Sequence, residues 1–529
     1  MKSLLSIAIC VLLLAYRTLG YNFPFEAVQL APADTEAFSA IAFGDAGEAH
    51  PVPDSHGCRV FPGEASWPPV EEWEKLNSSL GGALLQPLPP GAVCYKDSHY
   101  YDQAACNRLL TSARSSRFYV DDPVTEMTVW TQGRTCPVTN NPEGNCTQGG
   151  FPAYVVNATT VKQVQMGVNF ARNRKLRLVV NNTGHDFVGR SVGAGSLSIW
   201  THHLKDFEFA PQYQQGGSRG MAAKVSSGLE SWEMFSFMEC HNMTLVVPSD
   251  STVGVYGGWM TGGGHSPIAS LYGLGADQPL SLQVVTADGR FVTADPDTNP
   301  DLYYALRGGG PGTYGIVTSA VVKAYPRLSF NSVTITFNTP DNGTLNAFWR
   351  AFAAENQFGK RDPQMYADIV AALRYSVEAG YQFHGIHLAP TEEAAARYGS
   401  GQPPNNGVSD AWRRATMHAD LFERVGDYST KGKALASYAR FNESMARWRA
   451  ASPDAGVYVN EAGLLEPRWQ EAFWGYKYAG LVAIKRRYDP WDLFWAPNTV
   501  GSEGWAVETE DFLPSQNGRL CRVASQGWK

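Results

Sequence analysis

The sequence predicts a two-domain α+β fold, from its length and from the different patterns of its two halves. The chain has 529 residues, more than one hydrophobic core usually supports, so two domains are expected. The first half contains a predicted β-α-β unit, followed by glycine-rich turns between β-branched segments. From Asn331 onward, strands such as 332–337 alternate with amphipathic helices such as 345–354, which is typical of an α+β domain.

The β-α-β unit is predicted from the spacing of apolar residues. Residues 153–156 and 176–180 form short apolar runs that indicate buried strands. Between them, Val161, Val164 and Val168 recur on one face of a predicted helix over 160–174. Further strands are expected at 196–200 and from Ile316, each after a glycine-rich turn.

The chain divides into five expected segments. Residues 1–20 have the form of a secretory signal peptide, with Lys2, an apolar run over 4–15 and a cleavage position before Tyr21. Residues 21–121 are rich in proline and glycine and are expected to form an N-terminal elaboration packed on the first domain. That domain covers 122–326 and the second covers 327–484. Residues 485–529 are expected to end a helix, add a strand and return to the first domain.

Composition indicates an exported protein and excludes some partners. The net charge of −7 gives no electrostatic reason to bind nucleic acid. No stretch after the signal peptide is long and apolar enough to be a membrane helix, so no membrane partner is expected. Seven Asn-x-Ser/Thr triplets agree with a secreted glycoprotein, at Asn77, Asn145, Asn157, Asn181, Asn242, Asn342 and Asn442.

Seven cysteines remain once the signal peptide is removed. They are too scattered for a metal cluster, and no metal is predicted. In an oxidising compartment most should pair, and the short loop between Cys136 and Cys146 makes that bridge the easiest to propose. Because seven is odd, at least one thiol stays free or pairs with another chain.

Two motifs match known signatures without the structural context that those signatures need. Residues 189–193 (Gly-Arg-Ser-Val-Gly) fit the nucleophile elbow of serine hydrolases, which requires a helix after Ser191, where a strand is predicted instead. Residues 310–315 (Gly-Pro-Gly-Thr-Tyr-Gly) fit the dinucleotide fingerprint, but a strand follows where a Rossmann fold requires a helix. A hydrolase and a Rossmann fold are therefore both disfavoured.

The loop at 181–191 (Asn-Asn-Thr-Gly-His-Asp-Phe-Val-Gly-Arg-Ser) is the strongest candidate site. It follows a buried-looking strand, and its glycine, threonine and serine offer N–H groups and hydroxyls to an anion. His185 stands in the turn as a nucleophile or hydrogen-bond donor. On spacing alone, a histidine that bonds within its own loop is the stronger interpretation.

This loop resembles the FAD-binding loop of the vanillyl-alcohol-oxidase superfamily, in particular that of the fungal berberine-bridge-enzyme-like oxidases. Further segments match that family in order: 251–259, 261–267, 272–277, 301–310, 458–460 and 487–490. The resemblance implies a PCMH-type FAD-binding fold for residues 122–326. It also implies that 327–484 form an α+β substrate domain whose antiparallel sheet covers the flavin.

The resemblance implies that FAD is the cofactor and that His185 carries its 8α-methyl group covalently. The other residues expected to contact FAD are Asn182, Thr183, Gly184, Asp186, Ser191, Ser251, Gly254, Gly258, Gly264, His265 and Val317. Family members with two covalent attachments place a cysteine before the Thr-Val-Gly segment, where this chain has Asp250 and Ser251. Only the histidyl attachment is therefore implied.

The substrate side of the site is expected on two strands of the second domain. In the first, 411–421, Trp412, Arg414, Thr416 and His418 would share a face; in the second, 457–461, Tyr458 and Asn460 would share one. The candidate bases are Tyr458, Glu461 and His418, in that order. For any one of these residues, an ordinary place in the sheet core or at the surface is equally compatible with the pattern.

The implied function is a secreted oxidase with a small organic substrate and O2 as partners. In such enzymes a substrate carbon gives hydride to the flavin while a base takes a proton, and O2 reoxidises the flavin to give hydrogen peroxide. Related sugar oxidases often have a tyrosine where this chain has Glu461, so a secondary-metabolite alcohol or amine is favoured over an oligosaccharide. A flavin-retaining isomerase or cyclase is the main alternative, and a secreted binding protein with a vestigial site is a third.

Overall fold

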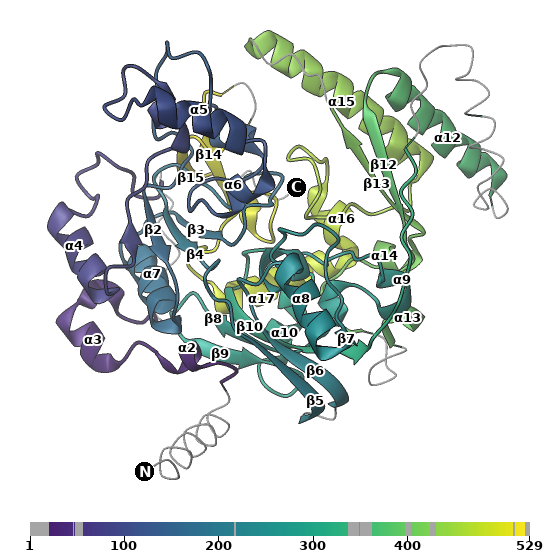
Figure 1. Cartoon of the computed structure of the whole chain (residues 1–529), viewed down its shortest axis with the longest axis horizontal. Helices are drawn as coiled ribbons and strands as arrows, with labels where there is room; N and C mark the ends of the chain where they lie inside the picture. Colours follow the sequence, from purple (N-terminus) through teal and green to yellow (C-terminus); the bar gives the residue numbers. More distant parts are fainter. Residues whose placement is uncertain are drawn as a thin grey trace.

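The computed structural model describes residues 21–45, 47, 57–215, 218–336, 349, 362–396, 404–423, 430–511 and 514–523, and Figure 1 shows the course of the chain. The predicted signal peptide at 1–20 and almost all of the predicted helix at 345–354 lie outside these residues. Among the helices described, none is both long and apolar enough to cross a membrane.

A four-stranded sheet contains the predicted β-α-β unit. In spatial order its strands are β1 (Leu84–Leu85), β2 (Tyr154–Asn157), β4 (Leu197–Trp200) and β3 (Leu178–Asn181). β2 and β3 both run parallel to β4, and α7 (Val161–Asn173) connects β2 to β3. The helix begins at a capping box in which the Thr160 hydroxyl accepts a hydrogen bond from the Gln163 N–H. The predicted helix and its flanking strands are confirmed.

A five-stranded antiparallel sheet lies next to the first sheet (Figure 1). Its spatial order is β5 (Phe207–Gln215), β6 (Ser218–Ser226), β10 (Ile316–Lys323), β8 (Pro279–Val285) and β9 (Phe291–Ala294). β10 directly follows the glycines at 310–315, so the strand predicted from Ile316 is confirmed. The dinucleotide-like motif therefore lacks the helix that a Rossmann fold needs.

The two sheets share a packed interior. Val285 of β8 and Ile316 of β10 pack in one cluster with Phe170 of α7 and Leu197 of β4. A second cluster includes Leu282 of β8 and extends to Trp474 near the C-terminal end of the chain. Buried apolar side chains of these two clusters therefore pack on both sides of the loops that lie between the sheets.

The second half of the chain adds a helix-backed strand pair. β12 (Gln382–His387) and β13 (Met417–Phe422) pair antiparallel. α12 (Pro363–Glu378) and α15 (Lys431–Ala451) lie beside each other next to this pair, in green in Figure 1. Trp448 of α15 donates its indole N–H to the Ser376 hydroxyl of α12 at 3.0 Å. Helices packed against an antiparallel pair confirm the α+β class.

Of three strand predictions in this half, two are wrong and the third is right only in its second part. Residues 411–421 begin as the short helix α14 (Ala411–Arg414), and only the part that belongs to β13 is extended. The helix forms because the Ser409 hydroxyl and carbonyl accept the N–H groups of Ala411 and Trp412. Trp412 and Arg414 therefore do not share a strand face with His418. Residues 457–461 form a turn closed by the Glu461 N–H and the Tyr458 carbonyl, and 332–336 have no regular structure.

The C-terminal segment returns to the first half of the chain. α16 (Trp469–Trp474) and α17 (Tyr478–Tyr488) precede the antiparallel pair β14 (Trp505–Glu508) and β15 (Arg519–Arg522). The helix end expected after Lys485 is confirmed. The strand expected between Asp489 and Val500 is not formed, because Asp489 accepts the N–H groups of Leu493 and Phe494 and bends the chain there.

Three disulfides join the described cysteines. Cys136–Cys146 is the bridge that the sequence predicted, and Cys94–Cys106 closes a second short loop. Cys58–Cys521 fastens the N-terminal region to β15. Cys240 is exposed and free, which accounts for the odd number.

Short elements complete the fold. They are α2 (Pro24–Ala27), α3 (Pro32–Ala37), α4 (Val70–Ser79), α5 (Gln103–Ser112), α6 (Ser116–Val120), α8 (Ser231–His241), α9 (Ala269–Tyr272), α10 (Pro300–Leu306), α13 (Glu392–Ala396), and the pair β7 (Met243–Thr244) and β11 (Tyr325–Pro326).

Candidate active site

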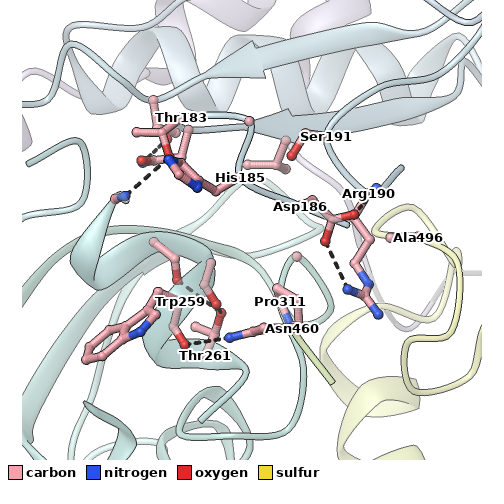
Figure 2. Close-up of a pocket in the computed structure, with 18 of the residues that line it drawn as sticks. Thr183, His185, Asp186, Arg190, Ser191, Trp259, Thr261, Pro311, Asn460 and Ala496 are labelled. Carbon is pink, nitrogen blue, oxygen red and sulfur yellow. Dashed lines mark hydrogen bonds and ion pairs between the residues drawn. The ribbon is translucent and has the colours of Figure 1, made fainter. Parts of the chain in front are cut away.

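A cavity opens where the two sheets meet the second half of the chain. Its walls come from the loop after β3 and from the segments 250–261, 311–317, 458–461 and 494–496. Figure 2 shows the side chains around it. The empty volume is about 1440 Å³, with the solvent at the open mouth included. Concave sites of this kind, lined by several chain segments, are where cofactors and substrates normally bind.

The loop after β3 forms one wall. All six of its predicted site residues line the cavity: Asn182, Thr183, Gly184, His185, Asp186 and Ser191. Gly184 has a φ of +69°, and a Cβ there would lie 2.9 Å from the Thr125 carbonyl oxygen, so only glycine suits this turn. The Thr183 hydroxyl accepts the Gly254 N–H at 3.2 Å (Figure 2), which fastens the loop to the opposite wall.

His185 lies largely buried beside a hydroxyl and a carboxylate. Its Nε2 is 2.7 Å from Thr252 Oγ1 and 3.9 Å from Asp250 Oδ1. Burial lowers the pKa of His185 and outweighs the charges of Asp250 and Glu230, which act to raise it. At neutral pH the imidazole is therefore neutral, and one ring nitrogen keeps the lone pair that a nucleophile needs.

A glycine-rich wall faces this loop. Gly254, Gly258 and Val317, all predicted site residues, line it. A Cβ at Gly258 would find its nearest atom 3.8 Å away, and a Cβ at Gly312 would find none within 4 Å. These positions therefore face open space, where a bound group can approach the backbone closely.

Three predicted cofactor-binding residues do not line the cavity. Ser251 is exposed at the surface. The Gly264 N–H donates to the Tyr458 hydroxyl at 3.2 Å, and His265 is turned toward Glu461. The structure thus places Gly264 and His265 behind the side chains that form the wall.

Arg190 lines the cavity but was not predicted from the sequence as a site residue. Its Nη1 donates to Asp186 Oδ2 at 2.9 Å (Figure 2), and its Nε donates to the Pro497 carbonyl at 3.1 Å. Its Nη2 is buried and has no hydrogen-bond partner among the described residues. A fixed guanidinium with a free N–H edge is suited to an anion. Its position inside the 181–191 loop was the available signal.

Other lining residues were missed, among them Trp259, Thr261 and Pro311. Asn460, which was expected on the substrate side of the site, does line the cavity. Figure 2 shows Asn460 near Trp259 and Thr261, on the far side of the cavity from His185. Asn460 donates to the Trp259 carbonyl at 3.0 Å. Contacts between segments that are distant in the sequence cannot be predicted from local sequence patterns.

Two histidines and a glutamate meet at the cavity wall formed by residues 458–461. Glu461 Oε1 lies 2.9 Å from His265 Nε2, and Glu461 Oε2 lies 2.6 Å from His418 Nε2. His418 Nε2 is also 3.1 Å from Asp420 Oδ1. Glu461 lines the cavity, whereas the histidines stand behind it. The ligand atoms of His265, His418 and Glu461 lie within 4.8 Å of one another, a spacing that could also hold a metal ion.

Charge pairing controls the protonation of this cluster. Burial alone would lower the pKa of His418, but hydrogen bonds to Asp420 and Glu461 outweigh it and raise the pKa to about 9. Burial would raise the pKa of Glu461, but hydrogen bonds from His265 and His418 hold that pKa far below its ordinary range. At neutral pH Glu461 is an anion and His418 a cation.

Tyr458 lines the cavity as a neutral phenol. Its hydroxyl oxygen accepts hydrogen bonds from the Gly264 N–H and from Asn460 Nδ2, the latter at 2.7 Å. Burial raises the pKa of Tyr458, and the negative charge of Glu461 raises it further. The phenol can therefore donate or accept a hydrogen bond, but it does not ionise near neutral pH.

Ser191 lacks the surroundings of a hydrolase nucleophile. A turn and then β4 follow it, so the helix that a nucleophile elbow requires is missing from this part of the described chain. The hydrolase interpretation therefore has no structural support.

The chemistry of the walls fits FAD. The free edge of Arg190 and the loop after β3 suit a diphosphate, and the bare glycines at 258 and 312 leave space for a flat ring. The buried Oδ1 of Asn182 has no partner among the described residues and offers an acceptor. His185 lines the same cavity.

Comparison with known proteins supports FAD as the cofactor. The FAD binding domain family matches residues 152–295, and the berberine and berberine-like family matches residues 457–501. The chain is 31% identical to the VAO-type flavoprotein oxidase VAO615 of Thermothelomyces thermophilus, over 93% of this chain and 100% of that protein. It is 29% identical to the FAD-linked oxidoreductase ZEB1 of Gibberella zeae, over 89% of this chain and 96% of that protein.

Solved structures show the same relationship. The crystal structure of the VAO-type flavoprotein MtVAO615 from Myceliophthora thermophila C1 superposes with a TM-score of 0.78 and 28% sequence identity, covering 88% of this chain and 100% of that one. With 31% identity to VAO615 over 93% of its length, the chain belongs to the berberine-bridge-enzyme-like, VAO-type family of FAD-dependent oxidoreductases.

Proposed function

We propose that this protein is an exported oxidase that transfers hydride from a small organic substrate to FAD joined covalently to His185, with O2 as the reoxidant. The observation that carries the proposal is one continuous cavity with His185 in one wall and Tyr458 and Glu461 in another. Bound FAD supplies the hydride acceptor. The protein supplies its position and the acid-base groups.

The cavity walls divide the tasks of holding a cofactor and holding a substrate. Arg190, Asn182 and the glycine-rich turns offer hydrogen bonds and space to a cofactor. Across the cavity, Tyr458 and Glu461 offer a phenol and a carboxylate to the substrate. Such a preformed arrangement fixes a donor carbon close to the hydride acceptor, which lowers the barrier through orientation.

Glu461 is the residue we assign as proton acceptor, and the low pKa set by its two histidine partners makes it a weak base. Tyr458 keeps its proton at neutral pH because burial raises its pKa, and His418 is already protonated with a pKa of about 9. Glu461 is an anion and lines the cavity. The cation on His418 holds the carboxylate in place through their 2.6 Å contact.

A small secondary-metabolite alcohol or amine fits the site better than an oligosaccharide. The acceptor Glu461 occupies the place where sugar-oxidising relatives often have a second tyrosine, so a carboxylate replaces a phenol at this position. The substrate bond that loses hydride would be a C–H bond next to oxygen or nitrogen.

Export is supported by the disulfides. Six of the described cysteines pair in three bridges, and such bridges persist in oxidising compartments and are rare in the cytosol. The predicted signal peptide at 1–20 accounts for the route.

A second candidate function rests on a named relative. The chain is 29% identical to the bifunctional decalin synthase calF of Penicillium decumbens, over 89% of this chain and 96% of that protein. An enzyme of this fold can therefore carry a cyclase function, and a flavin-retaining cyclase or isomerase is the alternative to an oxidase here.

Two measurements on the purified full-length protein test the proposal. Candidate alcohols and amines are screened with an oxygen electrode and a peroxide assay, and the oxidase consumes one O2 and releases one H2O2 per product. Product formed without oxygen uptake would instead support the cyclase. The protein is also precipitated in acid. Flavin in the wild-type pellet and none in that of His185→Ala supports the covalent attachment, and a colourless wild-type pellet overturns it.

A further inference from the structure

A chain of hydrogen bonds runs from His185 to the surface. His185 Nε2 contacts Thr252 Oγ1 at 2.7 Å, and the Thr252 hydroxyl donates to Asp250 Oδ1 at 3.0 Å. The backbone N–H of Thr252 donates to the same oxygen at 2.9 Å, which fixes the carboxylate. Thr252 is only 5% exposed, whereas the side chain of Asp250 is 57% exposed. The buried imidazole is thus connected to solvent through two side chains.

The donors in this series of hydrogen bonds determine which ring nitrogen of His185 carries the hydrogen. A threonine hydroxyl has one hydrogen, and here the Asp250 carboxylate, which only accepts, takes it. Thr252 Oγ1 must then accept from His185, so the hydrogen of the neutral imidazole lies on Nε2. The lone pair is consequently on Nδ1. This is the logic by which a carboxylate fixes the tautomer of a catalytic histidine.

We infer that Thr252 and Asp250 are positioning residues for the covalent attachment of FAD, which hold His185 with Nδ1 as the nucleophile and carry away the proton of Nε2. The inference rests on the attachment at His185 proposed above. Relatives with two attachments have a cysteine before the Thr-Val-Gly segment, where this chain has Asp250 and Ser251. In this chain Asp250 therefore serves the histidyl link instead of a second bond to the cofactor.

The attachment balances with O2 as the oxidant. A C–N bond forms between His185 Nδ1 and the 8α carbon, and one C–H bond of the 8α-methyl group breaks. The methyl hydrogen and the Nε2 hydrogen leave as protons. The two electrons released pass to the flavin ring and then to O2, which with two protons becomes H2O2. Thr252 takes the Nε2 proton as its own proton moves to Asp250, and the exposed carboxylate exchanges with water.

The test measures the fraction of flavin that stays covalently bound after acid precipitation and the fraction that acid releases. All proteins are purified under the same conditions. Thr252→Val removes the hydroxyl with little change in volume, and Thr252→Ser restores it. Asp250→Asn removes the charge. Thr244→Val is the matched control, since Thr244 is also a buried threonine, 6% exposed, but its hydroxyl accepts from Leu328 N–H. NMR of the flavin peptide identifies the linked nitrogen.

We expect the flavin to be linked through Nδ1 of His185. The fraction of flavin that is covalently bound should fall at least twofold in Thr252→Val and Asp250→Asn, and should equal the wild-type fraction in Thr252→Ser and Thr244→Val. A purely structural role would lower total flavin and the midpoint of thermal unfolding together without changing the covalent share. An unchanged share in Thr252→Val, or a link through Nε2, overturns the inference. Absence of covalent flavin in the wild type would instead overturn the attachment at His185.

Discussion

Glu461 Oε2 lies 2.6 Å from His418 Nε2, although 43 positions separate the two residues in the sequence. The contact joins β13 to the turn after α15 and places an ion pair at the cavity wall formed by residues 458–461. The side chain of His418 is 9% exposed, so solvent screens the pair weakly. The pair therefore sets both the charge of the cavity wall and part of the stability of the second half of the chain.

Glu461→Gln should abolish most of the turnover without loss of flavin. The amide keeps the size of the side chain but cannot take a proton, and removal of general-base catalysis typically lowers kcat about 10²- to 10⁴-fold. Steady-state kinetics and the flavin absorbance of the same sample provide the measurement. Glu466→Gln is the control, because Glu466 pairs with Arg449 at 3.1 Å away from the cavity walls. Turnover of Glu461→Gln within a factor of three of wild type would remove Glu461 from the mechanism.

The His418 pair should make stability depend on alkaline pH. The folded-state pKa of His418 is about 9, above the ordinary value near 6.5, so its contribution is complete below about pH 6.5. It is lost as the pH rises toward 9, because in this window the folded protein still holds a proton that the unfolded chain has released, so a rise in pH favours unfolding. The slope is at most about 1.4 kcal/mol per pH unit.

Urea unfolding of wild type and His418→Asn between pH 6 and 10 measures this slope. The wild type should lose free energy of unfolding between pH 6.5 and 9, and the variant should lack that component. Parallel curves for the two proteins across this window would show that the histidine is not charged in the folded state.

The first half of the fold was predictable because its signals are local. The spacing of Val161, Val164 and Val168 and the cap at Thr160 specify α7 without reference to the rest of the chain. The second half was not, because apolar spacing does not distinguish a strand from a buried turn. Trp412 lies on a short helix and Tyr458 on a turn, and both are buried by contact with each other and with His418.

The candidate site divides in the same way. The contiguous loop around His185 was found from one segment of sequence, since neighbours in the chain remain neighbours in the fold. In the sequence, Asp250 is distinctive only because it stands where some relatives have a cysteine. Its link to His185 depends on the contact between His185 and Thr252, which are 67 positions apart, so only the folded structure shows it. Arg190 lay within the recognised loop, but its free edge becomes visible only once Asp186 and Pro497 are seen to occupy the rest of its guanidinium.

Arg190→Gln should weaken the binding of FAD but not of riboflavin. Its unpaired Nη2 can bind a diphosphate oxygen, and a charge-assisted hydrogen bond of roughly 1.5–3 kcal/mol corresponds to about a 10- to 100-fold change in Kd. The measurement uses the His185→Ala background, where flavin is not linked, and titrates both flavins by fluorescence quenching. Riboflavin has no phosphate and is the internal control. An equal loss of affinity for both flavins would mean that Arg190 supports the fold of the loop and does not contact the cofactor.

Loss of the Cys58–Cys521 bridge should destabilise the cavity more than loss of any other cysteine. The bridge closes a loop of 463 residues and holds the C-terminal segment, whose Gln516 carbonyl accepts the Ala194 N–H just before β4. Removal of a native disulfide typically costs 2–5 kcal/mol. The double variant Cys58→Ser, Cys521→Ser should therefore lower the midpoint of thermal unfolding by several degrees and increase the exposure of flavin to solvent quenchers. The control Cys240→Ser removes the exposed free thiol and should change neither quantity. If the double variant unfolds at the wild-type temperature, hydrogen bonds such as that from Ala194 hold the C-terminal segment in place without the covalent bridge.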